Sequence, residues 1–175
     1  MPGERGVVMP ARSLKGRALQ WLAQREQSRV ELRRKLLPHA AAEDAAAAEA
    51  GAPPPELLPA TRVEAVLDWL EAHRYLSQER FAESRVHARA SRFGNLRIRQ
   101  ELKQHQVALS PDAALALKET ELQRARAVRE RKFAAWPASA AERARQARFL
   151  AGRGFSPEAI GRALRGPADP DEDER

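Results

Sequence analysis

The most constraining feature of this 175-residue sequence is a spacing that recurs at three expected helix starts. In each, a serine or glycine is followed by an apolar residue four positions on and by another four positions further. Residues four apart lie on one face of an α-helix, so each segment is predicted to open a helix with one apolar face. The three sets are Ser28, Leu32 and Leu36; Gly94, Ile98 and Leu102; and Ser156, Ile160 and Leu164.

An aromatic residue followed by leucine precedes three helix starts. Trp21 lies seven residues before Ser28, Phe149 lies seven before Ser156, and Trp69 lies eight before Ser77. Each unit is therefore interpreted as a helix, a tight turn and a second helix. Such units cannot bury their apolar faces alone and must stack as a repeat. Chance alignment is the alternative, because a capping residue followed by apolar residues is how many helices begin.

The composition favours helices along the whole chain. Ala, Leu, Arg, Glu and Gln dominate, and all of them are good helix formers. A single Tyr and few β-branched runs leave little from which to build a sheet, so the sequence predicts an all-α protein. The absence of Cys excludes disulfides and thiolate metal sites and indicates a reducing compartment.

Proline, glycine and threonine residues place the expected helix boundaries. The second helix is expected to stop before Pro38 and to give way to an Ala/Pro-rich linker. The Ala stretch of this linker could be helical, whereas residues 53–59 are expected to be extended. Thr61 is the expected N-cap of the following helix. A long helix over residues 112–133 is expected to break near Thr120, and Pro137 is expected to end it.

The net charge of +7 is unevenly distributed. Residues 1–38 carry +6 and residues 63–166 carry +8, whereas residues 39–62 carry −3 and residues 167–175 carry −4. A basic body partly masked by two acidic segments favours an anionic partner, either nucleic acid or a protein that coats it. A solvated, Arg-rich helical surface explains the charge equally well.

Basic side chains gather in three groups. The first has few acids nearby and is predicted to contact an anion or an acidic protein; it consists of Arg85, Arg89 and Arg92 on one helix face and Arg97, Arg99 and Lys103 on the next helix. The other two groups are interleaved with Glu, so surface ion pairs are expected for them. They are Arg124, Arg126, Arg129, Arg131 and Lys132, and Arg29, Arg33, Arg34 and Lys35.

No catalytic or cofactor motif is present in the sequence. Its four His residues never pair at helical spacing, which argues against a metal site, and the glycine-rich phosphate-binding and nucleophile motifs are missing. We therefore expect no enzymatic activity and no cofactor. No apolar run approaches the ~20 residues of a membrane span, and the N-terminus has no apolar signal core, so a cytoplasmic protein is expected.

Four motifs in order resemble those of the RecX family of recombination regulators. Residues 75–84 read YLSQERFAES, similar to the family pattern Y-L-x-D-x-x-F-A. Residues 28–36 read SRVELRRKL, residues 94–102 read GNLRIRQEL, and residues 149–160 read FLAGRGFSPEAI. No single motif is specific, but the ordered set identifies the chain as a member of this family.

The resemblance implies a curved, elongated array of tandem three-helix repeats with about nine helices. It also implies a monomer that binds the RecA recombinase and its filament on DNA and mainly inhibits recombinase, ATPase and coprotease activities. Weak direct DNA binding would accompany this. A free-standing DNA-binding helical protein and a neutral helical scaffold are the alternatives.

The expected organisation follows from these motifs and boundaries. The segments are a disordered N-terminus (1–12), the first repeat (13–37), a linker insertion (38–61), the third helix of the first repeat (62–76), the second repeat (77–119), the third repeat (120–166) and a disordered acidic tail (167–175). The expected structural anchors of the repeats are Trp21, Leu32, Leu36, Trp69, Tyr75, Phe81, Ile98, Leu102, Phe149, Phe155, Ile160 and Leu164.

Overall fold

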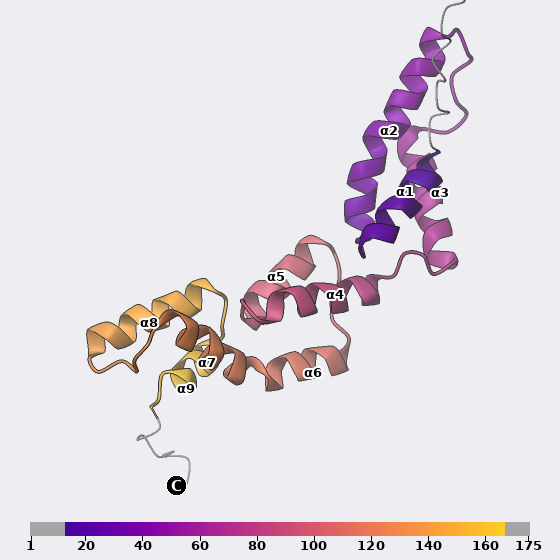
Figure 1. Cartoon of the computed structure of the whole chain (residues 1–175). Helices are drawn as coiled ribbons and strands as arrows, with labels where there is room; N and C mark the ends of the chain where they lie inside the picture. The colour runs from indigo at the N-terminus through magenta and orange to yellow at the C-terminus, as the bar shows by residue number, and fades with distance from the viewer. Residues whose placement is uncertain (1–12, 167–175) are drawn as a thin grey trace, which may run out of the picture. The chain divides into compact units, whose positions relative to one another are not determined.

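The computed structural model describes residues 13–166, and this part of the chain contains α-helices and no strand (Figure 1). The expectations for residues 1–12 and 167–175 lie outside the described residues. The all-α, three-helix repeat architecture expected from the sequence is confirmed. The helices are α1 (Leu14–Gln24), α2 (Arg29–Glu49), α3 (Pro59–Ala72), α4 (Gln78–Ala90), α5 (Asn95–Gln104), α6 (Pro111–Glu119), α7 (Glu121–Lys132), α8 (Ala140–Gly152) and α9 (Pro157–Ala163).

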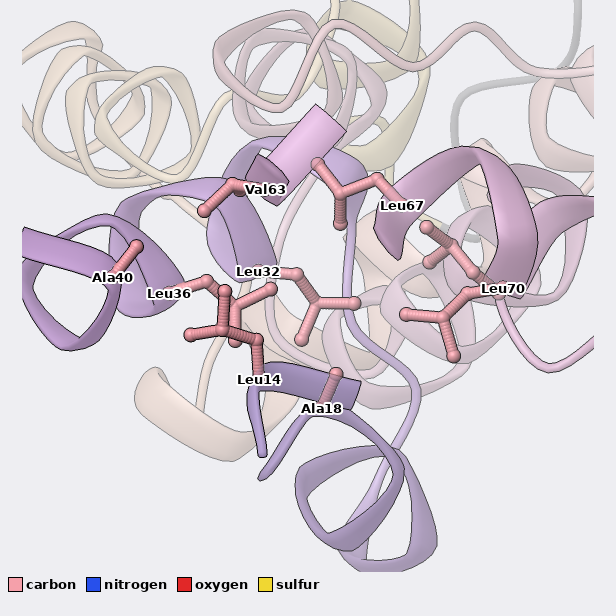
Figure 2. Packing of buried hydrophobic residues seen from close by; sticks show 9 residues of the cluster. Leu14, Ala18, Leu32, Leu36, Ala40, Val63, Leu67 and Leu70 are labelled. Carbon is pink, nitrogen blue, oxygen red and sulfur yellow. The ribbon is translucent and has the colours of Figure 1, made fainter. Parts of the chain in front are cut away.

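The chain divides into two compact units, here called the N-terminal unit and the C-terminal unit. The first ends at Gln78 and the second begins at Glu79. In the N-terminal unit, α1, α2 and α3 pack around one apolar core (Figure 2). Its fully buried side chains include Leu32, Leu36, Leu67 and Leu70. Truncating such a leucine to alanine costs about 2–5 kcal/mol, so these residues fix the packing of the three helices.

Helix α2 does not stop before Pro38, and the expected linker over residues 38–61 is wrong in its first half. The helix continues to Glu49 with Pro38 inside it. Tertiary contacts compensate for the hydrogen bond that proline removes. Ala40 is fully buried, and its carbonyl accepts a hydrogen bond of 2.9 Å from Arg62 of α3. Arg62 also pairs with Asp44, one turn further along α2.

Helix α3 begins earlier than expected. Leu58 is its N-cap and Pro59 its first residue, so Thr61 lies inside the first turn. Proline suits this position because its fixed φ is already helical and its missing N–H has no partner there. The non-helical stretch between α2 and α3 is therefore much shorter than the sequence suggested.

The C-terminal unit contains α4 to α9 and two apolar clusters. Phe81, Ile98 and Leu102 belong to the cluster of α4, α5 and α6, whereas Leu150 and Phe155 belong to that of α7, α8 and α9. The expected break at Thr120 is confirmed, since this residue separates α6 from α7.

Helix α7 ends at Lys132, five residues before Pro137, which was expected to end it. Phe133 already adopts an extended conformation, with φ −127° and ψ 117°. Its ring packs edge-to-face on Phe149 of α8, with 5.3 Å between the ring centroids. This contact draws the chain away from the helix axis before the proline is reached.

Most of the expected anchors lie in these clusters, but Tyr75 does not. Trp21, Trp69, Phe149 and Ile160 are partly buried at the edges of the clusters. Tyr75 is 49% exposed and stacks on Trp69 with 5.6 Å between the ring centroids. It is therefore a surface aromatic residue and not a core anchor.

Candidate interface for an anionic partner

The six cations of the first basic group do not lie on one continuous surface. Arg85 and Arg89 lie half-buried on α4, and Arg92 is exposed just after it. The remaining three, on α5, are exposed. Five of the six cations lie on three separate surfaces of the C-terminal unit, and Lys103 lines none of them. The five are Arg85, Arg89, Arg92, Arg97 and Arg99.

The first surface, here called the Glu101 hollow, has about 430 Å³ and is lined by Arg85, Arg89, Arg97 and Glu101. The Nε atom of Arg89 donates to Glu101 over 2.9 Å, and Arg97 approaches the same carboxylate at 3.8 Å. The carboxylate neutralises part of the charge that the sequence predicted here. Arg85 lies over the ring of Phe81, with 5.1 Å from its guanidinium carbon to the ring centroid.

Four arginines lie against the ring of Phe93. The guanidinium carbons of Arg89, Arg92 and Arg97 lie 5.7, 5.7 and 4.7 Å from the centroid of its ring. Arg153, at the end of α8, lies at 5.6 Å. Such cation–π contacts contribute about 0.5–1 kcal/mol each at exposed sites and hold the arginines close together despite their repulsion.

The second surface, here called the α7–α8 groove, has a volume of about 330 Å³. Its lining residues are Arg92, Val128, Arg131, Lys132, Phe149 and Arg153. Four of these six are cations, and none is acidic. Within the described residues, Arg92, Lys132 and Arg153 make no ion pair. The groove therefore combines a partly apolar floor with uncompensated positive charge.

The third surface, here called the α5–α9 groove, has about 630 Å³. Arg99 lines this groove and is thus separated from Arg97. Three further cations and three carboxylates also line it: Lys118, Arg126, Arg162, Glu119, Glu121 and Glu158. Opposite charges are mixed here, so this groove is closer to neutral. Lys103 lines none of the three surfaces.

A buried carboxylate that the sequence did not single out joins α5 to α9. Glu121, the first residue of α7, accepts hydrogen bonds from the backbone N–H of Asn95 at 2.9 Å and of Ser156 at 3.2 Å. The hydroxyl of Ser156 donates to it over 2.7 Å. A negative charge is favourable at both helix N-termini. Glu121 thus fixes the distance between the second and third repeats.

Two members of the second basic group, Arg124 and Arg129, have structural roles, and Arg124 bonds to main-chain oxygens where surface pairs with Glu were expected. This guanidinium donates to the carbonyls of Phe93 and Leu117, each over 2.9 Å, and to Asn95. Burial lowers the pKa of Arg124, and the charge of Glu121 partly opposes this. Its hydrogen bonds to main-chain oxygens give this half-buried side chain a structural role.

Arg129 of the same group is also buried. Its guanidinium carbon lies 3.7 Å from the centroid of the Trp136 ring, and it donates to the carbonyl of Ala135 over 3.2 Å. Arg129 therefore anchors the loop between α7 and α8.

In the third basic group, Arg29 and Arg33 form ion pairs, but with acids of α3. Glu31, the interleaved acid of their own helix, pairs with Arg25 instead. Arg29 of α2 reaches Glu64, Asp68 and Glu71 of α3, each over 2.6 Å. Arg33 also pairs with Glu64. The hydrogen bonds from Arg33, and those from Arg29, lower the pKa of Glu64 to about 2, although burial opposes them. These residues hold α2 against α3.

Residues 13–166 contain neither a metal-binding cluster nor a membrane-spanning helix. No group of three or more His, Cys, Asp or Glu side chains there could hold a metal ion. None of the helices in this range is long and apolar enough to cross a bilayer. The described residues thus define an all-α helical-repeat protein with basic grooves on its surface.

Comparison with known proteins gives the family. Residues 77–109 match the family model of the second three-helix domain of RecX, and residues 119–164 match that of the third. The chain is 48% identical over 159 residues to regulatory protein RecX of Ralstonia nicotianae, covering 88% of this chain and 87% of that protein. It is 49% identical over 158 residues to regulatory protein RecX of Leptothrix cholodnii, covering 89% and 90%. The chain belongs to the RecX family of regulatory proteins, which confirms the resemblance.

Proposed function

We propose that this protein binds the RecA recombinase and its filament on DNA and mainly inhibits the recombinase, ATPase and coprotease activities of RecA. Family membership carries this proposal, and the basic grooves of the C-terminal unit supply a physical mechanism. A filament on DNA is a polyanion, so cations that lack internal partners are the ones free to meet it. Inhibition would be steric and electrostatic, with no chemistry performed by the chain itself.

The α7–α8 groove is the part of the first basic group that we assign to this contact. Arg92 lies in it, whereas Arg89 and Arg97 are partly neutralised by Glu101. Arg131 and Lys132 of α7 and Arg153 of α8 complete the charge. The contact surface thus combines the second and third repeats, and the C-terminal unit would carry most of the electrostatic binding.

A RecA ATPase assay on single-stranded DNA tests the proposal. The protein, titrated from substoichiometric to equimolar amounts, should reduce the turnover of ATP by several-fold. Binding to the same DNA without RecA is measured in parallel at several salt concentrations. Inhibition with weak naked-DNA binding supports the proposal. Tight, steeply salt-dependent binding to naked DNA, with no change in the ATPase activity of RecA, would instead identify a free-standing DNA-binding protein.

A further inference from the structure

The α7–α8 groove has a second candidate occupant within this chain. We propose that the acidic segment 169–174 binds in the groove and competes there with the anionic partner. Five of these six residues are Asp or Glu. The intramolecular contact stands independently of the proposed function, but its regulatory consequence rests on it.

Charge complementarity selects this groove over the other two surfaces. Glu101 occupies the Glu101 hollow, and Glu119 and Glu158 line the α5–α9 groove, so an acidic segment would meet repulsion in both. The α7–α8 groove presents four cations and no carboxylate. Arg131 donates to the carbonyls of Ser91 and Ala127, which leaves its charge uncompensated. Glu130 lines the adjoining hollow, which shares Arg131 with the groove, and it pairs with Arg129 at 3.7 Å.

The point of attachment allows the acidic segment to reach the groove. A Cβ built on Gly166 would lie 3.9 Å from the ring of Trp136, so the described chain ends beside the loop that follows α7. Trp136 comes four residues after Lys132, a lining residue of the groove. The acidic residues lie three to eight positions beyond Gly166, and an extended chain covers about 10–28 Å over that length. The groove and the attachment point are thus at the same end of α7.

Tethering makes a weak contact effective. A short tether gives an effective concentration of about millimolar, so the acidic segment would occupy the groove even if each ion pair contributes little. An incoming polyanion must displace the segment. Removal of its charges is therefore expected to raise the affinity for an anionic partner by about 3–10-fold at low salt, and high salt should reduce the difference.

Carbodiimide coupling in the full-length chain tests the contact directly. The reagent joins a carboxylate to an amine only where the two touch, and Lys132 is the one lysine that lines the groove. Peptide mapping of the monomer should show segment 169–174 coupled mainly to Lys132, and Arg92→Glu should reduce this product several-fold. Lys132→Arg keeps the charge but removes the amine, so it controls for specificity. Coupling spread evenly over Lys103, Lys118 and Lys132 would overturn the proposal.

A second experiment measures the consequence. The variant in which the five acids of segment 169–174 become Asn or Gln should bind RecA filaments about 3–10-fold more tightly. The matched control is Glu49→Gln with Glu56→Gln, which removes exposed acids outside the C-terminal unit. Intact RecA inhibition without Lys132 coupling would leave the proposed function standing and overturn this inference. Coupling to Lys132 in a protein that does not bind RecA would support the intramolecular contact and overturn the proposed function.

Discussion

At the scale of single residues, Gly94 shows how closely the second and third repeats approach each other. A Cβ on this residue would lie 2.2 Å from the Cα of Phe155 and 2.3 Å from the carbonyl oxygen of Gly154. The backbone N–H of Gly94 donates to the carbonyl of Arg153, and that of Leu96 donates to Gly154, each over 3.0 Å. The two turns at the repeat spacing therefore pack backbone to backbone.

Gly94→Ala should consequently destabilise the protein by about 2–3 kcal/mol, because a backbone neighbour cannot move aside as a side chain can. Gly152→Ala is the matched control. Gly152 is the last residue of α8, and a Cβ on it would have no neighbour within 4 Å. It should leave the stability unchanged or raise it by up to about 1 kcal/mol. Urea unfolding of both variants checks this, and equal midpoints would contradict the packing of the two turns.

At the scale of elements, the pairing of α2 with α3 is sensitive to pH through Glu64. The pKa of this carboxyl is about 2 in the folded protein, below its ordinary value of 4.5. A lowered pKa stabilises the folded state above the unfolded pKa, and this contribution is lost as the pH falls through the folded pKa. Between about pH 5 and pH 2, the wild type should lose about 1 kcal/mol more stability than Glu64→Gln, because partly exposed pairs are weak.

The control for this prediction is Glu56→Gln, which changes an exposed carboxylate in the segment before α3. Its stability should follow that of the wild type across the same pH range. Parallel curves for the wild type and Glu64→Gln, recorded by chemical denaturation, would show that the Arg29 and Arg33 pairs contribute nothing.

Pro38 is the second element-scale prediction. Pro38→Ala should restore the hydrogen bond to the carbonyl of Arg34 and stabilise the protein by about 1–3 kcal/mol, since the helix already continues through this position. Pro54→Ala, in the exposed stretch between α2 and α3, should change stability by less than about 0.5 kcal/mol. Thermal unfolding compares the two variants, and no gain from Pro38→Ala would mean that α2 has adapted fully to the proline.

At the scale of the whole molecule, local signals predicted the helices better than the site. Ser110 and Ser156 cap α6 and α9 with their side chains, because capping depends only on residues a few positions away. The continuation of α2 depends on Arg62, a contact across 22 residues, and no local rule reveals it. Arg153 reaches Phe93 from 60 residues away, and no local rule predicts that these two residues meet.

The division of the chain into repeats at the expected boundaries stays a prediction, as does the assignment of the first basic group to a partner. Glu121 had one detectable signal: it is an acid directly after a helix break, where its carboxylate lies near helix N-termini. Nothing in the sequence tells which two N-termini those are. That information arises only when the N-termini of α5 and α9 meet at Glu121 in the folded chain.

The most direct test of the account is co-sedimentation of the protein with RecA filaments preformed on single-stranded DNA. It compares the wild type, the groove variant Arg92→Glu with Lys132→Glu, and the control Arg143→Glu with Arg148→Glu on the exposed face of α8. Both double variants change the net charge equally. The account predicts that the groove variant binds at least about tenfold more weakly and the control within about twofold of the wild type. Equal weakening of both, or of neither, would contradict a specific role of the α7–α8 groove.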